Sequence, residues 1–208
     1  MKFVNFFKLT ATALLLVSGA VNAQTITGTL HDLGNYLGNA SADGKICVFC
    51  HTPHNATTVT PAPPLWNKVQ TASVFTIYAS PTIDNPTGQP EGTSLACLTC
   101  HDGTLAMDAM INPPSGYVPD NLQMGGDNNL GTNLSNDHPI SIGYSLASDP
   151  DFVAPTTVVN TLPLFSGTQD ASYQVECGSC HNVHDDTINP FLRIDNANSA
   201  LCLTCHVK

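Results

Sequence analysis

Cysteine and histidine recur together in this chain in one fixed pattern, Cys-x-x-Cys-His. The pattern begins at Cys47, Cys97, Cys177 and Cys202, and it accounts for all eight cysteines of the sequence. On a helical turn the two cysteines and the histidine share one face, so two thiols can bond the vinyl groups of a haem while the imidazole meets its iron. The pattern is typical of covalent c-type haem attachment and predicts four haems.

The residues of each predicted haem site follow from this pattern. The covalent attachment residues are Cys47, Cys50, Cys97, Cys100, Cys177, Cys180, Cys202 and Cys205. The proximal iron ligands are His51, His101, His181 and His206. Paired cysteines also occur in structural zinc sites and in the disulfide frameworks of exported proteins. Zinc does not require a histidine after every second cysteine, and a disulfide framework does not explain four short loops of the same length, so haem is the preferred interpretation.

The number of histidines matches the number of predicted iron positions. Four haem irons offer eight axial positions, and the sequence contains eight histidines. The predicted distal ligands are those outside the motifs, His31, His54, His138 and His184. Bis-histidine ligation leaves no iron position open to a substrate, so electron transfer is predicted rather than catalysis. A haem enzyme subunit with an open iron site is an alternative.

Two of the distal candidates stand three residues after a proximal ligand, since His54 follows His51 and His184 follows His181. The porphyrin plane separates each of them from the far face of its own haem. Each is therefore expected to bind a neighbouring haem, so that the segment around it holds two haems close together.

The N-terminus predicts export. Lys2 and Lys8 precede an apolar stretch at residues 11–17, and residues 21–23 end in a small side chain, as before a signal-peptide cleavage site. Residues 1–23 are therefore a predicted signal peptide. No later apolar run approaches the roughly 20 residues needed to span a bilayer, so no transmembrane segment is expected in the mature chain. The predicted location is extracellular or on the outer cell surface, with the periplasm as the alternative.

The composition restricts both partners and fold. Once Lys2 and Lys8 are removed with the signal peptide, four cations and sixteen carboxylates remain, a formal net charge of −12. Nucleic acid and anionic membranes are not expected partners, because both require a basic surface. The predicted fold class is a multihaem c-type cytochrome, mostly irregular, with short helices at the motifs, few short strands and a core formed by haems. Asp43, Ser94 and either Asn198 or Ser199 are predicted helix caps, and Thr156 to Leu164 is a predicted extended segment.

Internal repetition divides the chain into two modules. Residues 94–101 are echoed by residues 199–206, and the His-x-x-His run that begins at His51 is echoed at His181. The predicted first dihaem module is residues 24–112 and the second is residues 113–208. Shared haem contacts are expected to join them into one continuous tetrahaem unit.

A longer succession of segments carries a family resemblance. The segments are Cys47 to His54, Pro64 to Asn67, Asp84 to Pro90, Gly92 to Cys97, Leu134 to Ile140 and Ser199 to His206. In this order they resemble the tetrahaem outer-surface cytochromes of metal-reducing bacteria, the OmcE-like family of extracellular cytochrome filaments. The resemblance covers essentially the whole mature chain. It implies filaments in which bis-histidine haems form a continuous conductive stack, and it implies that His31 ligates a haem of the adjoining subunit.

The two modules suggest a polymer by a separate route. If the lone histidine of each module ligates a haem of the preceding module, His138 reaches back to the first haem pair and His31 has no preceding module in its own chain. A head-to-tail contact that repeats without closing makes a filament. If each module is complete in itself, the chain is a monomeric soluble periplasmic electron shuttle. The expected partners are further copies of the chain, periplasmic or outer-membrane redox donors, and extracellular electron acceptors.

Overall fold

The chain is mostly irregular. The computed structural model describes residues 26–38, 44–58 and 63–207, so the predicted signal peptide lies outside the described residues. Loops and turns connect short helices, as the composition predicts, and α2 is a helix of ten residues. Within the described ranges, no helix is both long and apolar enough to cross a membrane.

The regular elements are short and scattered along the chain. The α-helices are α1 (Leu33–Tyr36), α2 (Gly92–His101), α3 (Pro155–Val158), α4 (Cys177–Cys180) and α5 (Ala200–Cys205). The 3-10 helices are η2 (Ile46–Phe49), η3 (Gly126–Asn128) and η4 (Ala197–Ser199). Strands β1 (Ile142–Gly143) and β2 (Gln174–Val175) pair antiparallel, with Ile142 opposite Val175.

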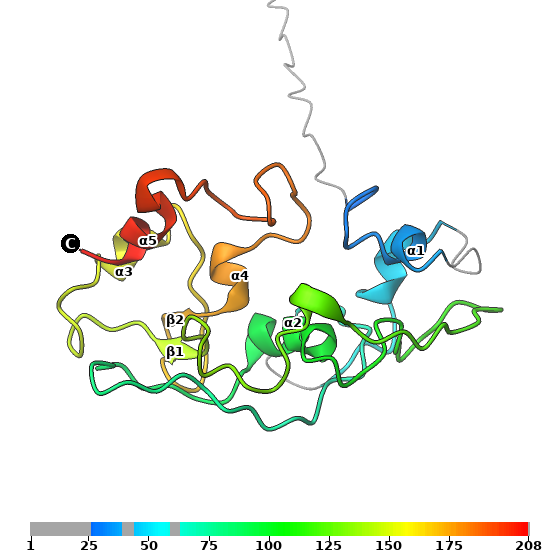
Figure 1. Cartoon of the computed structure of the whole chain (residues 1–208), viewed down its shortest axis with the longest axis horizontal. Helices are drawn as coiled ribbons and strands as arrows, with labels where there is room; N and C mark the ends of the chain where they lie inside the picture. Colours follow the sequence, from blue (N-terminus) through cyan, green and yellow to red (C-terminus); the bar gives the residue numbers. More distant parts are fainter. Residues whose placement is uncertain (1–25, 39–43, 59–62, 208) are drawn as a thin grey trace, which may run out of the picture.

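Each Cys-x-x-Cys-His motif lies on a short helix or at its end. The first motif is on η2, the second on α2, the third on α4 and the fourth on α5. Figure 1 shows α1, α2, α4 and α5 following one another along the long axis of the molecule, with the C-terminus at the end away from α1. The motifs therefore follow one another in space in the order of the sequence.

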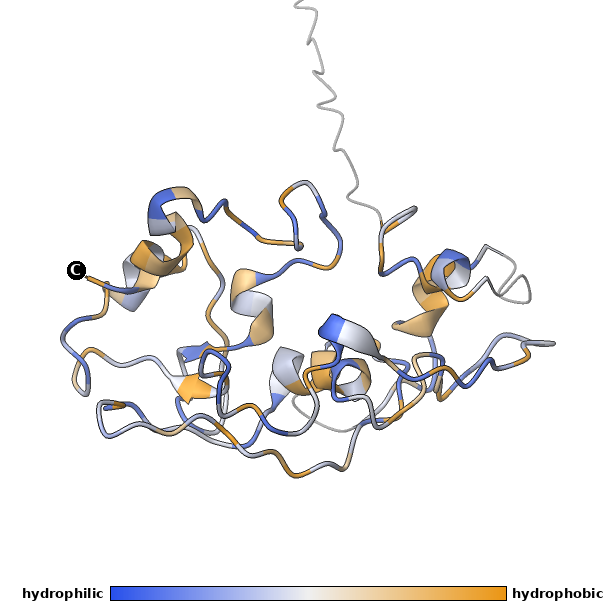
Figure 2. Cartoon of the chain, in the orientation of Figure 1, coloured by the Kyte–Doolittle hydropathy of each residue, from blue (hydrophilic) through white to orange (hydrophobic). Residues whose placement is uncertain are grey.

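The apolar core of the described chain is divided into small clusters. The buried members are Leu33 with Phe49, then Phe75 with Leu98 and Leu134, and then Tyr144 with Val158 and Leu162. Phe49 belongs to the first motif, Leu98 to the second, and Cys205 of the fourth motif packs against the third cluster. Figure 2 shows the same pattern, because hydrophobic and hydrophilic stretches alternate along the whole trace and do not gather into one layer.

Two expectations about local structure are wrong. The segment from Thr156 to Leu164 begins with a helix rather than a strand, because Pro155 occupies the first turn of α3, where its missing N–H costs no hydrogen bond. Ser94 lies inside α2, where its buried hydroxyl accepts a hydrogen bond from the backbone N–H of Cys177 (2.8 Å). Ser199, one of the two candidates predicted there, is the N-cap residue of α5, although its side chain makes no capping hydrogen bond. Asp43 lies outside the described residues.

A buried polar network joins the two modules where α2 meets α4. The Glu176 carboxylate accepts hydrogen bonds from Gln174 Nε2 (2.6 Å) and from Ser141 Oγ (3.1 Å). Gln174 Nε2 also donates to Glu91 Oε1 (2.7 Å), on the residue that precedes α2. Contacts between segments far apart in the sequence therefore hold the third motif against the second.

Glu176 is expected to make stability depend on pH. Burial raises the pKa of its carboxyl above the usual 4.5, and the nearby Glu91 carboxylate adds to the rise. The folded state keeps this proton to a higher pH than the unfolded chain, so the free energy of unfolding falls as pH rises through the folded pKa. Glu176→Gln should therefore gain stability over the unmodified chain at about pH 8 but not at about pH 4. Urea denaturation at both pH values checks this, and an equal difference at both would contradict it.

Candidate haem-binding sites

The cysteines of successive motifs are neighbours in the folded chain. All eight cysteines lie within the described residues, and none of them forms a disulfide. Burial raises the pKa of Cys50 in the first motif to about 11, and the Cys100 thiol of the second motif contributes to the rise. A hydrogen bond between the Cys97 and Cys177 thiols raises the pKa of Cys97 and lowers that of Cys177. The second motif is therefore close to both the first and the third.

The fourth motif continues this row. Burial raises the pKa of Cys180 in the third motif to about 11, and the Cys205 thiol of the fourth motif is the next largest cause. The thiol groups thus neighbour one another in the order first, second, third and fourth motif. Groups attached to them would form one row along the molecule.

Three of the four proximal histidines are held in the tautomer that binds metal. The Nδ1 atom of His51 lies 2.8 Å from the carbonyl oxygen of Pro64, that of His101 lies 2.8 Å from Asn128, and that of His181 lies 2.9 Å from Pro190. A carbonyl oxygen can only accept a hydrogen bond, so Nδ1 carries the proton. Nε2 then keeps its lone pair, which is the state an iron ligand needs.

Two of these carbonyl groups belong to equivalent segments of the two modules. We call residues 64–67 and residues 190–193 the return segments, because each runs back beside a motif. The first return segment pairs Trp66 with His51 in an antiparallel bridge, and the second pairs Leu192 with His181 in the same way. The chain around the third motif therefore repeats the fold of the chain around the first.

The backbone of the return segments shows the same repetition. Leu65 has a φ of +56° and Phe191 a φ of +58°, a left-handed conformation that bulky side chains seldom adopt. The Leu65 carbonyl accepts the N–H of Thr52 (2.8 Å), and the Phe191 carbonyl accepts the N–H of Asn182 (2.8 Å). The sequence analysis did not identify this repeat. Its signal is a proline followed by two large hydrophobic residues, which occurs at Pro64 and at Pro190, although the same pattern also occurs at Pro163.

Histidine rings lie near each other in pairs. The ring centres lie 6.2 Å apart in His51 and His184, 6.3 Å apart in His31 and His101, and 6.4 Å apart in His138 and His206. Each pair combines one proximal ligand with one distal candidate. With metal–imidazole bonds of about 2 Å and about 1.2 Å from Nε2 to the ring centre, two rings on one iron would lie about 6.4 Å apart. The pairs therefore have the spacing of two axial ligands, and the residues fit haem.

The partners in these pairs follow a rule. The lone histidines His31 and His138 each pair with the second motif of their own module, whereas His184 reaches from the second module to His51 in the first. This reverses the arrangement supposed from the sequence, in which the lone histidines reach back. Figure 1 shows why, because the segment after α4 extends toward α1 before it returns to α5.

The His31 ring packs against residues of its own chain. Its ring makes an edge contact with Phe191, with centroids 4.6 Å apart, and also lies near the His101 ring. Burial lowers the pKa of His31 to about 4, and the neighbouring His101 adds to this effect. The imidazole is therefore neutral at physiological pH, as a metal ligand must be. The resemblance implied a place for His31 at a neighbouring subunit, and this position differs from it.

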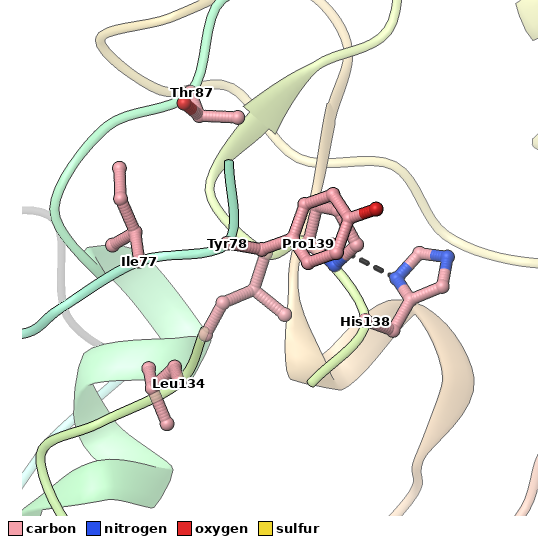
Figure 3. Close-up of a pocket in the computed structure, with 7 residues that line it drawn as sticks. Ile77, Tyr78, Thr87, Leu134, His138 and Pro139 are labelled. Atoms are coloured by element: carbon pink, nitrogen blue, oxygen red, sulfur yellow. Dashed lines mark hydrogen bonds between the residues drawn. The ribbon is translucent and has the colours of Figure 1, made fainter. Parts of the chain in front are cut away.

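His138 borders an apolar pocket (Figure 3). The pocket is lined by Ile77, Tyr78, Thr87, Leu134, His138, Pro139 and Ile140. The Nδ1 atom of His138 lies 2.9 Å from the carbonyl oxygen of Pro139, which again fixes the proton on Nδ1. Aliphatic side chains beside an available Nε2 are suited to the edge of a porphyrin.

His54 and His181 remain outside the ring pairs. Both are exposed, and among the residues that the structure describes neither ring lies against another histidine. Also within those residues, no group of three His, Cys, Asp or Glu side chains is close enough to hold a metal ion directly.

Comparison with known proteins bears on the C-terminal motifs. Residues 171–208 match the family model described as the doubled CXXCH motif. This segment contains the third and fourth motifs and indicates a multihaem c-type cytochrome, and the eight cysteines fit four such motifs. No curated protein matches the chain.

Proposed function

We propose that this multihaem c-type cytochrome is a tetrahaem electron-transfer protein that polymerises into an extracellular filament and conducts electrons along stacked haems. The observation that carries the proposal is the order of the motifs, whose thiols neighbour one another from the first motif to the fourth. Haem bound at these motifs supplies one-electron exchange between ferric and ferrous iron. A row of haems in which each neighbours the next provides a path for electrons from one end of the molecule to the other.

The histidine pairs support electron transfer over catalysis. Each pair has the separation of two imidazoles on one iron, as for His51 and His184 at 6.2 Å. Imidazoles on both sides of an iron exclude substrate from it and keep the ligand set the same in both oxidation states. The divided apolar core supports haem as well, because each small cluster lies beside a motif, where a porphyrin would join it to the next.

Lys68 is a cation buried beside the first two motifs. Its side chain is only 1 % exposed, and its Nζ donates a hydrogen bond to the carbonyl oxygen of Met107. The ammonium opposes the effect of burial on the pKa of both Cys50 and Cys100, so it lies close to the attachment residues of two sites. A nearby positive charge favours the ferrous state, which carries one positive charge fewer.

Lys68→Met is therefore expected to lower the midpoint potential of one or two haems. A unit charge about 8 Å away at an effective dielectric constant of about 20 contributes about 2 kcal/mol, which corresponds to a shift on the order of 50–100 mV. Spectroelectrochemical titration measures the shift. Lys45→Met is the control, because Lys45 is exposed and water screens its charge. Equal shifts in the two variants would contradict this role for Lys68.

The polymer rests on two further observations. The sequence resembles extracellular cytochrome filaments along the mature chain. Within the described part of the chain, the candidate ligands His54 and His181 stand outside the histidine ring pairs. Export follows from the predicted signal peptide. The donors are then periplasmic or outer-membrane redox proteins, and the acceptors lie outside the cell.

Electron microscopy of the secreted protein, with current measured along single particles, tests this function. Filaments that carry current are the expected result. Monomers that exchange electrons in solution would instead support the periplasmic shuttle, and a particle that reduces nitrite or peroxide at an iron would support an enzyme.

A further inference from the structure

The ring pairs and the return segments define a repeating rule for distal ligation. In the second module, the lone histidine pairs with the second motif of its own module, and His184, three residues after the first motif of that module, pairs with His51 of the preceding module. In the first module, the lone histidine His31 follows the same rule, since it pairs with His101. One histidine of the first module, His54, is left to be placed.

The rule assigns His54 a partner outside its own chain. His54 occupies the position in the first module that His184 occupies in the second, so its partner is the first motif of the preceding module. In a head-to-tail polymer, the preceding module is the second module of a neighbouring copy, and the histidine of its first motif is His181. Among the residues that the structure describes, His181 is also the proximal ligand whose ring is not paired with another histidine ring.

We propose that His54 of one copy is the distal ligand of the haem bound at His181 of the neighbouring copy, so that this pair, and not His31, joins the subunits. The inference rests on the proposed filament function and names the bond that makes the filament. It uses every histidine once and leaves no iron with an open position.

His54 lies on a turn whose backbone is held by hydrogen bonds. The Thr52 hydroxyl donates to the carbonyl oxygen of His54 (2.8 Å), and the Thr52 N–H donates to the carbonyl of Leu65 (2.8 Å). On the other side, Asn112 Nδ2 donates to the carbonyl of Asn55 (2.8 Å), whose φ of +55° turns the chain. The backbone around His54 is therefore fixed while its ring is exposed, which lowers the entropy cost of binding a second copy.

His181 is prepared to take part in such a bond. Its Nδ1 is held by the Pro190 carbonyl at 2.9 Å and its backbone N–H by the Cys177 carbonyl at 3.0 Å. Ring orientation and tautomer are thus set by its own chain. An iron held by His181 needs only a second imidazole from outside.

The same pairing rule keeps the row of motifs continuous across the junction between two copies of the chain. Within one chain, the pair formed by His184 and His51 links the third motif to the first, and the second motif neighbours both of them. By the same relation, His54 and His181 of two copies would link a first motif to a third motif, with the fourth motif between them. The first motif of one copy then follows the fourth motif of its neighbour, and electrons cross the junction without a gap in the row.

The first experiment is His54→Ala in the full-length secreted protein. All Cys-x-x-Cys-His motifs remain intact, so four covalent haems per chain are expected by pyridine haemochrome assay. About one haem per chain should become high-spin, and electron micrographs should show monomers or short oligomers. Filaments of normal length with four low-spin haems per chain would overturn the inference.

Co-expression with the unmodified chain distinguishes two possibilities. Either His54 ligates a haem of a neighbouring copy, or it ligates a haem of its own chain. A tagged His54→Ala copy can still accept His54 from an unmodified copy, so its haems should return to low-spin when unmodified chains are in excess. The same copy has no residue-54 imidazole to offer to the next copy, so it should end filament growth. Filaments should shorten as the fraction of this variant rises. If its high-spin signal persists in the mixture, His54 serves its own chain and the inference fails.

His184→Ala is the matched control, because His184 has the same place after its motif but pairs within the chain. It should also lose about one low-spin haem yet retain filaments, and its signal should not be rescued by unmodified chains. His54→Met covers the case in which His54→Ala fails to fold, since a thioether should restore filaments and raise the potential of one haem.

If the unmodified protein is itself a monomer with four low-spin haems, the filament function fails. If filaments form from His54→Ala as readily as from the unmodified chain, only this inference fails.

Discussion

His184→Ala is expected to turn about one of the four haems high-spin while all four remain covalently attached. The centre of the His184 ring lies 6.2 Å from that of the His51 ring, with an interplanar angle of 20°, so removing His184 takes one of two imidazoles from a single iron. That iron should then bind small ligands such as carbon monoxide. Electron paramagnetic resonance and the pyridine haemochrome assay together measure both quantities.

His184→Met is the companion variant. The thioether can still reach the iron, so the haem should stay low-spin, and its midpoint potential should rise because methionine stabilises ferrous iron relative to a second imidazole. A redox titration resolves this change. Four low-spin haems in His184→Ala, or unchanged potentials in His184→Met, would show that His184 is not a ligand.

His31→Ala should produce a defect within the chain rather than at a subunit junction. Its ring is half-buried against His101 and Phe191, so the haem at His101 should become high-spin and the fold should lose about 1–3 kcal/mol. Filaments should still form, because the inferred junction uses His54. Chemical denaturation and electron microscopy measure the two effects.

The resemblance of the sequence predicts a different outcome for the same variant. If His31 ligates a haem of the adjoining subunit, His31→Ala should release monomers or short oligomers. His31→Met is a control for packing, because it fills much of the space and offers a ligand. Loss of filaments in His31→Ala together with intact filaments in His54→Ala would return the junction to His31.

The chemistry of this chain is legible in its sequence because haem attachment depends on residues only a few positions apart. The four motifs, the eight cysteines and the match between histidines and axial positions needed no tertiary information. The mostly irregular fold followed from prolines, glycines and short polar residues in the same local way. Ser94 shows the limit, since it looked like a local cap and its hydroxyl instead accepts the N–H of Cys177, from the other module.

The pairing of histidines was not predictable, because it depends on where long irregular segments return. From the sequence, His31 and His138 were expected to ligate a haem of the preceding module. Each instead lies beside the second motif of its own module. The return segments are a second example. Residues 64–67 and 190–193 share little beyond a proline and large hydrophobic side chains, and their equivalence appears only through the bridges to His51 and His181.

The central claim is that each chain holds four haems, each ligated by two histidines. Near-infrared magnetic circular dichroism of the secreted protein, normalised to the haem content per chain, tests it most directly, because this signal distinguishes bis-imidazole ligation from methionine ligation and from high-spin iron. The predicted result is four haems per chain, all low-spin and all with the bis-imidazole signal. Fewer than four haems, or a resting haem with methionine or with an open position, would contradict the account.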